Sequence, residues 1–259
     1  MDSVKIIIPS YKRAKMLYET TLELLLRFNV DIIKDVEIVV ESEEMKEEYL
    51  EIIPFKLKII VSNSDGLKGK RNFMRNYYQY KTDYEYILCL DDDINDILNI
   101  EGKSITQEEW IEMVEKGFEE CEKNGAYYWS ICPFDNSFFF KDKVSINLKY
   151  IIGAFHGIII DRDLPPFQTD FNHYEDYDFT AQHFLRDKSI VRLNMYGLKT
   201  KYYNPKGGLG EWYGGNDKRK EAQTNDRDKL INKYPDGMFK KISKKWGADV
   251  KLNYRFKVS

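Results

Sequence analysis

Cysteine is scarce in this chain. Cys89, Cys121 and Cys132 are scattered over 259 residues, and no two of them have CxxC spacing. An odd, scattered set argues against a cysteine-ligated zinc site, and it predicts a reducing compartment.

Long apolar runs are missing as well. No stretch approaches the ~18 apolar residues that a membrane helix needs. The first apolar run is short and ends at Pro9, so it does not have the form of a signal peptide. No long internal repeat or low-complexity linker is visible. We therefore expect a cytoplasmic protein with no membrane partner.

The chain has enough apolar residues to fold and an uneven charge. Hydrophobic residues make up 42% and aromatic residues 15%, which is typical of a globular protein. The net charge is −3, but residues 199–259 hold 16 Lys/Arg against 7 Asp/Glu. A polyanion is thus attracted only to the C-terminal part, unless that part is simply a solvated basic helix.

The first 90 residues alternate between strand and helix patterns. Near-continuous apolar strands joined by helices predict βαβ units and a mainly parallel sheet, buried on both faces. The strands are expected at residues 4–8, 36–40, 57–61 and 84–90, and the helices at 14–28, 43–53 and 70–80.

The pattern changes after residue 93. Thr106 and Glu109 form a capping box at the start of an expected helix, 106–123. A β-rich part follows, with the segments AYYWSIC, SFFFK, VSINLKYII and FHGIIID. Later elements are expected as helices at 175–185 and 217–234, strands at 189–196 and 250–256, and a glycine-rich loop at 207–215. We expect one α/β domain over 1–259, with a nucleotide-binding part (1–98), an acceptor part (99–198) and a basic C-terminal elaboration (199–259).

Three adjacent carboxylates end the fourth strand. Asp91, Asp92 and Asp93 follow the apolar run ILCL. Ligands of open α/β sheets bind beyond the carboxyl ends of the strands. Two carboxylates one residue apart can face a common hard cation, Mg²⁺ or Mn²⁺, which relieves their repulsion. The alternative is a surface turn capped by aspartates.

The other strand ends carry groups that suit a nucleotide. The first ends in PSYKR, the second in Glu41, and the third in SNSDG followed by LKGKRN. In the last of these, backbone N–H groups, a helix dipole and the cations Lys68, Lys70 and Arg71 favour a pyrophosphate. The candidate donor-binding residues are Pro9, Ser10, Tyr11, Arg13, Glu41, Ser62, Asn63, Gly66, Lys70, Arg71, Asp91 and Asp92.

The strand ends resemble the donor site of the GT-A glycosyltransferases, both in their motifs and in the order of these motifs along the chain: PSYKR, Glu41, GxxGKRN and LDDD. The resemblance covers about residues 4–93 in detail and extends loosely to 196. It implies a GT-A-like α/β fold, with a Rossmann-like nucleotide-binding half and a mixed β extension on the acceptor side. It also implies a divalent metal held against a nucleotide-sugar diphosphate. Asp93 is then the first metal ligand and Asp91 its partner, while Asp92 is expected to tolerate substitution best.

The same resemblance implies a catalytic carboxylate at a later helix start. Many inverting members have a Glu-Asp pair there, which corresponds to Glu175 and Asp176 in HYEDYDF. Asp176 is the expected general base, with Glu175 or Asp178 as substitutes. The alternative is that these are ordinary acidic residues complementing a helix dipole.

Two further features have open interpretations. His156, between small residues in GAFHGII, is a candidate metal ligand or sugar contact, although a lone histidine is commonly structural. The loop at 207–215 is either a lid that stacks Trp212 or Tyr213 on a ring or an ordinary surface loop.

The block GGxGEWYGGNDKRKEAQ is similar to the TET- and base-J-associated glycosyltransferases. That similarity implies transfer of a sugar, glucose from UDP-glucose, to a hydroxymethylated pyrimidine such as 5-hydroxymethylcytosine in double-stranded DNA, and a host-cytoplasm location if the gene is phage-borne. Trp212, Tyr213, Lys218 and Arg219 are the candidate acceptor contacts, with Lys220, Arg227 and Lys229 as further phosphate contacts. The net −12 charge of residues 1–198 opposes DNA binding, so any contact must be local.

Three hypotheses follow from the sequence. The first is a metal-dependent glycosyltransferase that acts on modified DNA bases. The second is the same catalyst with a glycan or protein acceptor. The third is a nucleotidyltransferase or a nucleotide-binding module, which needs no carboxylate base over an anomeric carbon.

Overall fold

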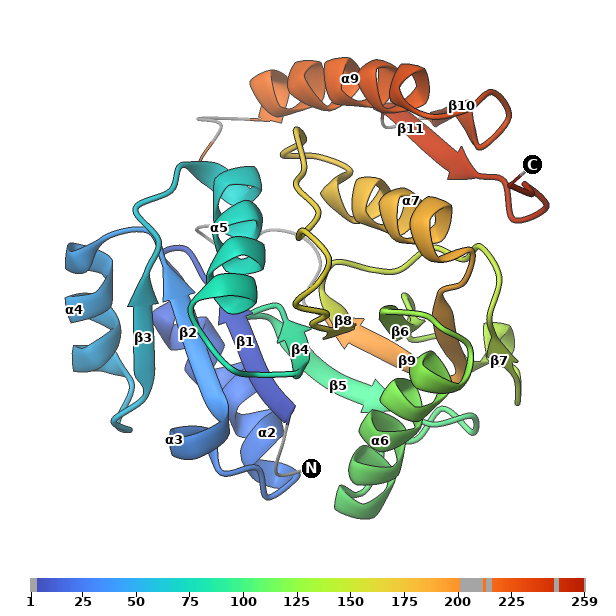
Figure 1. The fold of residues 1–259 in the computed structure, drawn as a ribbon. Helices are drawn as coiled ribbons and strands as arrows, with labels where there is room; N and C mark the ends of the chain where they lie inside the picture. Colours follow the sequence, from blue (N-terminus) through green and yellow to red (C-terminus); the bar gives the residue numbers. More distant parts are fainter. Residues whose placement is uncertain (1–3, 201–211, 213–215, 245–246, 259) are drawn as a thin grey trace.

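A mixed sheet of nine strands forms the centre of this computed structural model, in which residues 4–200, 212, 216–244 and 247–258 are described (Figure 1). Its strand order is β3-β2-β1-β4-β8-β6-β9-β5, with β7 paired to β9. The strands are β1 (Val4–Pro9), β2 (Val36–Val40), β3 (Lys58–Val61), β4 (Tyr86–Leu90), β5 (Ile94–Leu98), β6 (Tyr128–Cys132), β7 (Val144–Ser145), β8 (Phe155–Ile159) and β9 (Val191–Thr200). The first four are parallel, whereas β8 runs antiparallel to both β4 and β6.

Helices cover both faces of the sheet. They are α1 (Ala14–Leu17), the π-helix η1 (Tyr18–Leu22), α2 (Glu23–Arg27), α3 (Ile32–Asp35), α4 (Glu43–Ile52), α5 (Gly66–Tyr80), α6 (Gln107–Lys123), the 3₁₀ turn η2 (Ser137–Phe139), α7 (Glu175–Asp187) and α9 (Asn216–Lys233). Strand β1 shows how two cores arise. Ile6 and Ile8 join one apolar cluster with α2 and α6, and Ile7 points to the other cluster with α5 and α7.

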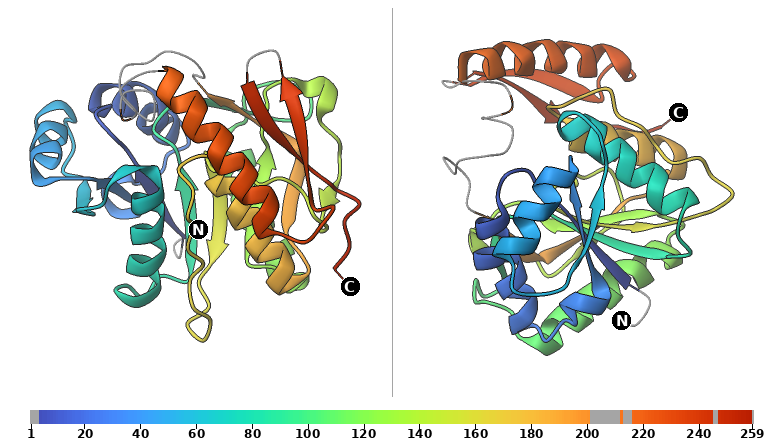
Figure 2. Two further views of the ribbon diagram at one scale, coloured as in Figure 1. Left: turned by 90° about the horizontal axis from the view of Figure 1, so that it is seen from above. Right: turned by 90° about the vertical axis from the view of Figure 1, so that its left-hand side faces the viewer.

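The C-terminal elaboration lies outside α7 (Figure 2). It consists of α9 and the hairpin β10 (Phe239–Lys244) and β11 (Gly247–Leu252). Leu230, Tyr234, Phe239 and Val250 are buried in the same apolar cluster as α7. The basic segment is therefore attached through an apolar face.

Most of the expected elements are confirmed, including the mainly parallel first half and the capping box at Thr106. The segment SFFFK is not a strand, because Asn136 caps a 3₁₀ turn and only Phe140 enters the core. In VSINLKYII only Val144 and Ser145 form a strand. Helix α5 begins at Gly66 rather than at residue 70.

Two strands differ from expectation. Strand β5 follows the acidic turn directly and was not anticipated, since INDIL carries polar residues in a strand at the end of the sheet path. The late strand expected at 250–256 is β11, and it pairs with β10 in a separate hairpin rather than joining the main sheet.

Candidate active site

The acidic turn after β4 is fixed by two threonines of the π-helix. The Thr20 hydroxyl donates to the Asp92 carbonyl (2.9 Å) and the Thr21 hydroxyl donates to the Asp91 carbonyl (2.8 Å). Thr21 also accepts from the Ile94 N–H at 3.0 Å. A π-helical turn widens the backbone and commonly marks a functional site. Here it holds three repelling carboxylates in one conformation.

Asp92 points into the protein. It is 5% exposed, and its carboxylate accepts from the Ser10 hydroxyl (2.5 Å) and from Arg13 (3.2 Å). Burial raises its pKa. The expectation that Asp92 tolerates substitution best does not fit this environment, because its removal takes the nearest carboxylate from Arg13 and one hydrogen bond from the buried Ser10 hydroxyl.

Asp93 is the carboxylate of the triplet whose charge is only partly offset. Its side chain is 17% exposed and lies 3.7 Å from Arg13. Burial, followed by the charges of Asp91 and Asp92, raises the pKa of Asp93 to about 7. Clustered oxygen donors with excess negative charge fit a hard divalent cation. Among the described residues, no group of three or more His, Cys, Asp or Glu side chains forms a metal site, so the fit rests on two carboxylates.

Lys70 connects the ends of β1 and β2. Its ammonium donates to the Ser10 carbonyl (2.8 Å), lies 3.6 Å from Glu41, and is 5.5 Å from the Tyr11 ring centroid. The side chain is buried, and burial lowers the pKa of Lys70. The ammonium is thus directed to the Ser10 carbonyl and Glu41 at the strand ends, and the predicted pyrophosphate contact stays a prediction.

The loop before α5 meets a residue from the C-terminal part. Asn63 has a positive φ of 48°, and its N–H donates to the Glu41 carbonyl at 3.1 Å. The Trp212 indole N–H donates to Asp65 at 2.9 Å, and its ring lies against Gly66. Trp212 thus lies beside the donor loop. Ser62 beneath it is buried and donates to the Val40 carbonyl at 2.9 Å.

Arg71 joins the two groups of candidate residues. One of its amino groups donates to Asp91 (2.8 Å) and to the Gly153 carbonyl (3.2 Å). The charges of Asp91 and Glu175 both raise the pKa of Arg71, against the effect of burial. A Cβ placed on Gly153 would lie 3.1 Å from Glu175 and 3.6 Å from Arg71. Gly153 therefore permits this close approach, which the sequence analysis missed.

Glu175 and Asp176 begin α7 as an acidic pair, in which Glu175 is buried and Asp176 is half-buried. The hydroxyl of Tyr150 donates to one Asp176 oxygen, and the Tyr177 N–H donates to the other at 2.8 Å. Burial is the main cause that raises the pKa of both carboxyls, to about 8 for Glu175. Tyr174, just before the helix, has a φ of +65°, which strains a non-glycine residue. Tyr150 carried no signal in the sequence.

His156 is a structural residue. It is 3% exposed, its Nδ1 lies 3.0 Å from the Gly153 carbonyl, and its ring meets Tyr128 edge-on. Burial holds its pKa well below the usual value. The small neighbour Gly157 accommodates a tryptophan, since a Cβ there would lie 1.8 Å from Trp129 Nε1. The predicted metal or sugar contact at His156 does not fit.

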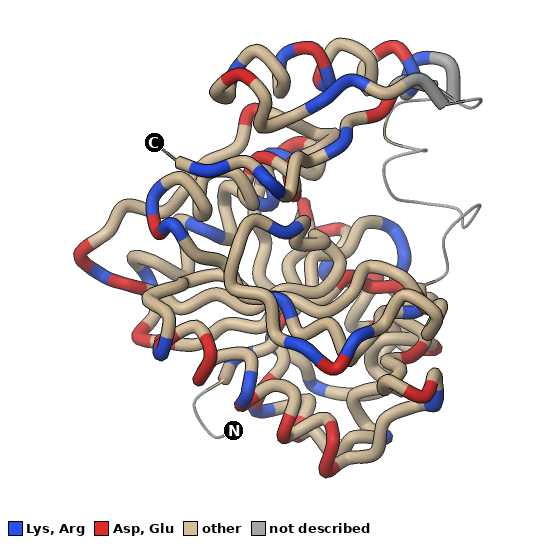
Figure 3. The backbone as a smooth tube through the Cα atoms, turned by 90° about the vertical axis from the view of Figure 1, so that its right-hand side faces the viewer, with Lys and Arg blue, Asp and Glu red and all other residues tan. Residues whose placement is uncertain are grey.

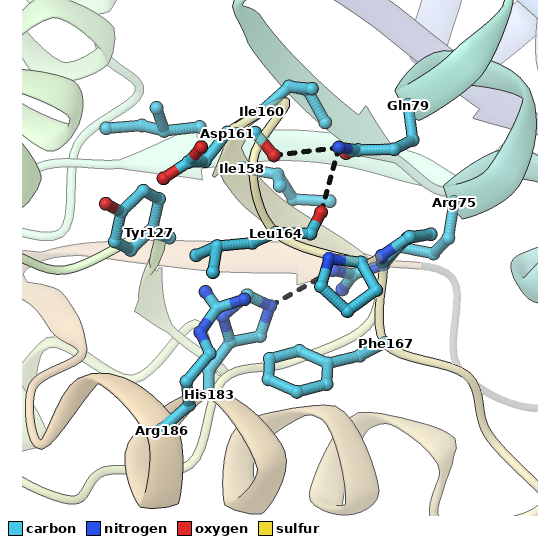
Figure 4. A pocket seen from close by; sticks show the side chains of 13 residues that line it. Arg75, Gln79, Tyr127, Ile158, Ile160, Asp161, Leu164, Phe167, His183 and Arg186 are labelled. Atoms are coloured by element: carbon cyan, nitrogen blue, oxygen red, sulfur yellow. Dashed lines mark hydrogen bonds between the residues drawn. The ribbon is translucent and has the colours of Figure 1, made fainter.

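A separate small pocket lies at the far end of β8, between α5, α7 and the loop at 160–167 (Figure 4). Arg75 donates to His183 Nε2 at 3.0 Å, and His183 Nδ1 lies 3.3 Å from Asp187. Because arginine stays protonated, His183 is neutral, accepts at Nε2 and donates from Nδ1. Burial lowers its pKa to about 3. This chain of contacts ties α5 to α7.

The remaining acceptor candidates lie on or before α9. Lys218 is exposed, while Tyr213 and the Arg219 side chain lie outside what the structure describes. Arg227 is 6% exposed and donates to Asp228 at 2.8 Å, so it does not fit the predicted phosphate contact. The structure thus brings most of the predicted donor-side residues together at one edge of the sheet, whereas the predicted acceptor contacts are spread over the C-terminal part; the roles of both groups stay predictions.

Comparisons with known proteins bear on the family and the fold of this chain. A family model described as TET-Associated Glycosyltransferase matches residues 4–208. The search of curated proteins gave no match. No helix among the described residues is long and apolar enough to cross a membrane.

Two solved structures illustrate the fold. Mannosyltransferase PcManGT from Pyrobaculum calidifontis, in complex with GDP-Man and Mn²⁺, is 14% identical with a TM-score of 0.57, over 90% of this chain and 65% of that chain. S. aureus TarS 1-349, in complex with UDP-GlcNAc, is 16% identical with a TM-score of 0.50, over 89% and 71%. The chain therefore spans slightly less than two thirds of the mannosyltransferase. The predicted GT-A-like fold is confirmed.

Proposed function

The chain belongs to the TET-associated glycosyltransferase family, and from this premise we propose that it transfers a sugar from a nucleotide-sugar to a hydroxyl acceptor with inversion. The proposed donor is UDP-glucose and the proposed acceptor is a hydroxymethylated pyrimidine in DNA. Asp176 is the proposed general base. The proposed donor site consists of the strand ends around Asp91 and Asp93.

The position of Arg71 carries this proposal. It contacts Asp91 at the donor edge and faces Glu175 at the start of α7. One guanidinium therefore separates the two groups of carboxylates. A sugar held at the first group lies within reach of a base in the second, and such positioning is a large part of catalysis.

The donor edge supports a metal-bound diphosphate. Asp91 and Asp93 supply the oxygen ligands that Mn²⁺ and Mg²⁺ prefer. A bound divalent metal would stabilise the negative charge of the departing diphosphate. The chain itself supplies Arg13, which lies 3.7 Å from Asp93, and the threonine-fixed turn that orients both carboxylates.

The acid pair supports general-base catalysis. Asp176 removes the proton of the acceptor hydroxyl as its oxygen attacks the anomeric carbon, and the diphosphate leaves from the opposite face. Burial raises the pKa of Asp176 toward working pH, which favours a base. The Tyr150 hydroxyl and the Tyr177 N–H lower the pKa of Asp176 against this effect and orient its carboxylate. Glu175, with a pKa of about 8, holds a proton beside it at neutral pH.

A donor and acceptor screen tests the proposal. Nucleotide-sugars are incubated with Mn²⁺ or Mg²⁺, and UDP or GDP release is followed with and without DNA containing 5-hydroxymethylcytosine or 5-hydroxymethyluracil. We expect UDP release that the modified DNA accelerates and that Asp176→Asn abolishes. Release accelerated by a glycan or protein instead would reassign the acceptor. Full turnover in Asp176→Asn would refute the assignment of Asp176 as the general base and would favour nucleotidyl transfer.

A further inference from the structure

Three phenylalanines are exposed on one ordered loop. Phe138 is 85% exposed, Phe139 is 54% exposed and Phe134 is 37% exposed. Their rings meet each other, with centroids 5.3 Å apart for Phe138 and Phe139 and 5.4 Å apart for Phe134 and Phe139. We name these three residues the phenylalanine cluster. Contiguous exposed apolar side chains mark interaction sites in soluble proteins.

The loop is built to present these rings. Asn136 accepts from the Phe138 N–H at 3.0 Å and thereby caps the 3₁₀ turn. Phe140 is buried, and its ring lies where a Cβ on Gly197 would be, so it anchors the loop in β9. The Lys141 N–H then donates to the Asn194 carbonyl at 2.9 Å. The exposure of Phe138 is thus a consequence of a fixed backbone.

Basic side chains follow on this segment and on β9, the strand that pairs with it. Lys141 and Lys143 are exposed, and Lys149 lies close enough to Lys141, Lys143 and Arg192 that their charges lower its pKa after the effect of burial. We name these four residues the basic cluster. They lie on the β7 side of the molecule, which faces the viewer in Figure 3. The exposed carboxylates Asp135 and Asp142 offset part of this charge, but the four cations remain in excess.

The basic cluster borders the candidate catalytic pair. Lys149 is followed directly by Tyr150, whose hydroxyl donates to Asp176. The Lys149 ammonium also lies 4.4 Å from the Tyr254 ring centroid, so it connects this region with the C-terminal tail. Tyr150 thus joins the chain segment that carries Lys149 to the proposed base.

We propose that the phenylalanine cluster and the basic cluster together form the surface that binds the acceptor DNA, an inference that rests on the proposed function. Lysine and arginine side chains bind phosphates, and aromatic rings stack on bases. A base attacked at the active site must leave the helical stack, and an exposed phenylalanine can take its place. This placement also explains how DNA approaches a part of the chain whose overall charge is negative.

Fluorescence anisotropy with the full chain and a labelled duplex containing 5-hydroxymethylcytosine tests the surface without requiring transfer. A plot of log K against log salt concentration has a negative slope, to which each phosphate contact contributes about 0.9. For Lys141→Gln/Lys143→Gln we expect this slope to become shallower by about 2. For Phe138→Ala/Phe139→Ala we expect binding about tenfold weaker at an unchanged salt slope.

Matched controls keep the test specific. Lys116→Gln/Lys123→Gln removes the same charge from α6, and Tyr80→Ala removes an aromatic ring that is 61% exposed at the end of α5. Both controls are expected to bind DNA like the unmodified chain.

The possible results separate this proposal from the proposed function. The proposed DNA-binding surface would be refuted if all variants had the same affinity and the same salt slope. It would also be refuted if the unmodified chain did not bind DNA. The proposal would also be overturned if Phe138→Ala/Phe139→Ala bound DNA like the unmodified chain but lost binding to anionic lipid vesicles. DNA binding that depends on the surface, without any sugar transfer, would refute the proposed function and leave the surface standing.

Discussion

The hydrogen bond between Tyr150 and Asp176 provides a direct test of the proposed base. The Tyr150 hydroxyl donates to one carboxylate oxygen, while the Tyr177 N–H holds the other. The hydroxyl bond lowers the pKa of Asp176 against the larger effect of burial, which raises it. Tyr150→Phe removes this bond and keeps the ring that stacks on Tyr177 at 4.4 Å.

The size of the effect follows from that bond. A hydrogen bond to a charged group contributes about 1.5–3 kcal/mol. One pKa unit corresponds to about 1.4 kcal/mol, so the pKa of Asp176 should rise by about 1–2 units. Because the base works ionised, the acid limb of kcat/KM must move to higher pH by the same amount. Above that limb the variant should recover its activity.

The assay is the pH dependence of kcat/KM, followed by UDP release. The Tyr177→Phe variant is the matched control, since Tyr177 contacts Asp176 through its backbone N–H. The other charged or hydrogen-bonding neighbours of Asp176 are unchanged in both variants, except that Tyr177→Phe also removes the Tyr177 hydroxyl; they are Glu175, Arg71, Tyr128, Tyr174 and the Gly153 backbone. An acid limb in Tyr150→Phe that coincides with that of the unmodified enzyme would refute Asp176 as the titrating base.

The remaining predictions concern three other positions. Arg71→Lys keeps the positive charge but loses the planar guanidinium that lies between the two groups of carboxylates. We therefore expect kcat/KM to fall by about 10–100-fold in steady-state assays. Asp92→Ala should lower the free energy of unfolding by about 2–4 kcal/mol and Asp93→Ala by less than about 1 kcal/mol in urea titrations, because Asp92 is buried and accepts from the buried Ser10 hydroxyl, whereas Asp93 is partly exposed. Equal losses would contradict this. Between pH 6.5 and about 3 the unfolded chain protonates His183 and the native chain does not, so stability falls with falling pH in this window. In His183→Phe that dependence should flatten, and the loss of the acceptor for Arg75 should cost about 2–4 kcal/mol at pH 7.

The parallel half of the fold was predictable because its information is local. The apolar run of β4 and the acidic triplet at its end specify both a buried strand and a polar edge. Parallel strands bring their carboxyl ends together whatever the loops do, so Ser10, Glu41 and Asp91 had to lie at one edge. The exposed loop around Phe138 was misread, because nothing in SFFFK shows which of its rings enters the core.

The sequence by itself determined the order of strands and helices, the acidic edge and the acidic start of α7, since each depends on residue types within a few positions. Only the tertiary structure decided the direction of each charged side chain. It turned Asp92 and Lys70 inward, left Asp93 with excess charge, and placed Arg71 between two groups of carboxylates. Such choices depend on which residues from distant segments become neighbours. Burial then sets the strength of each interaction, and neither is encoded in local spacing.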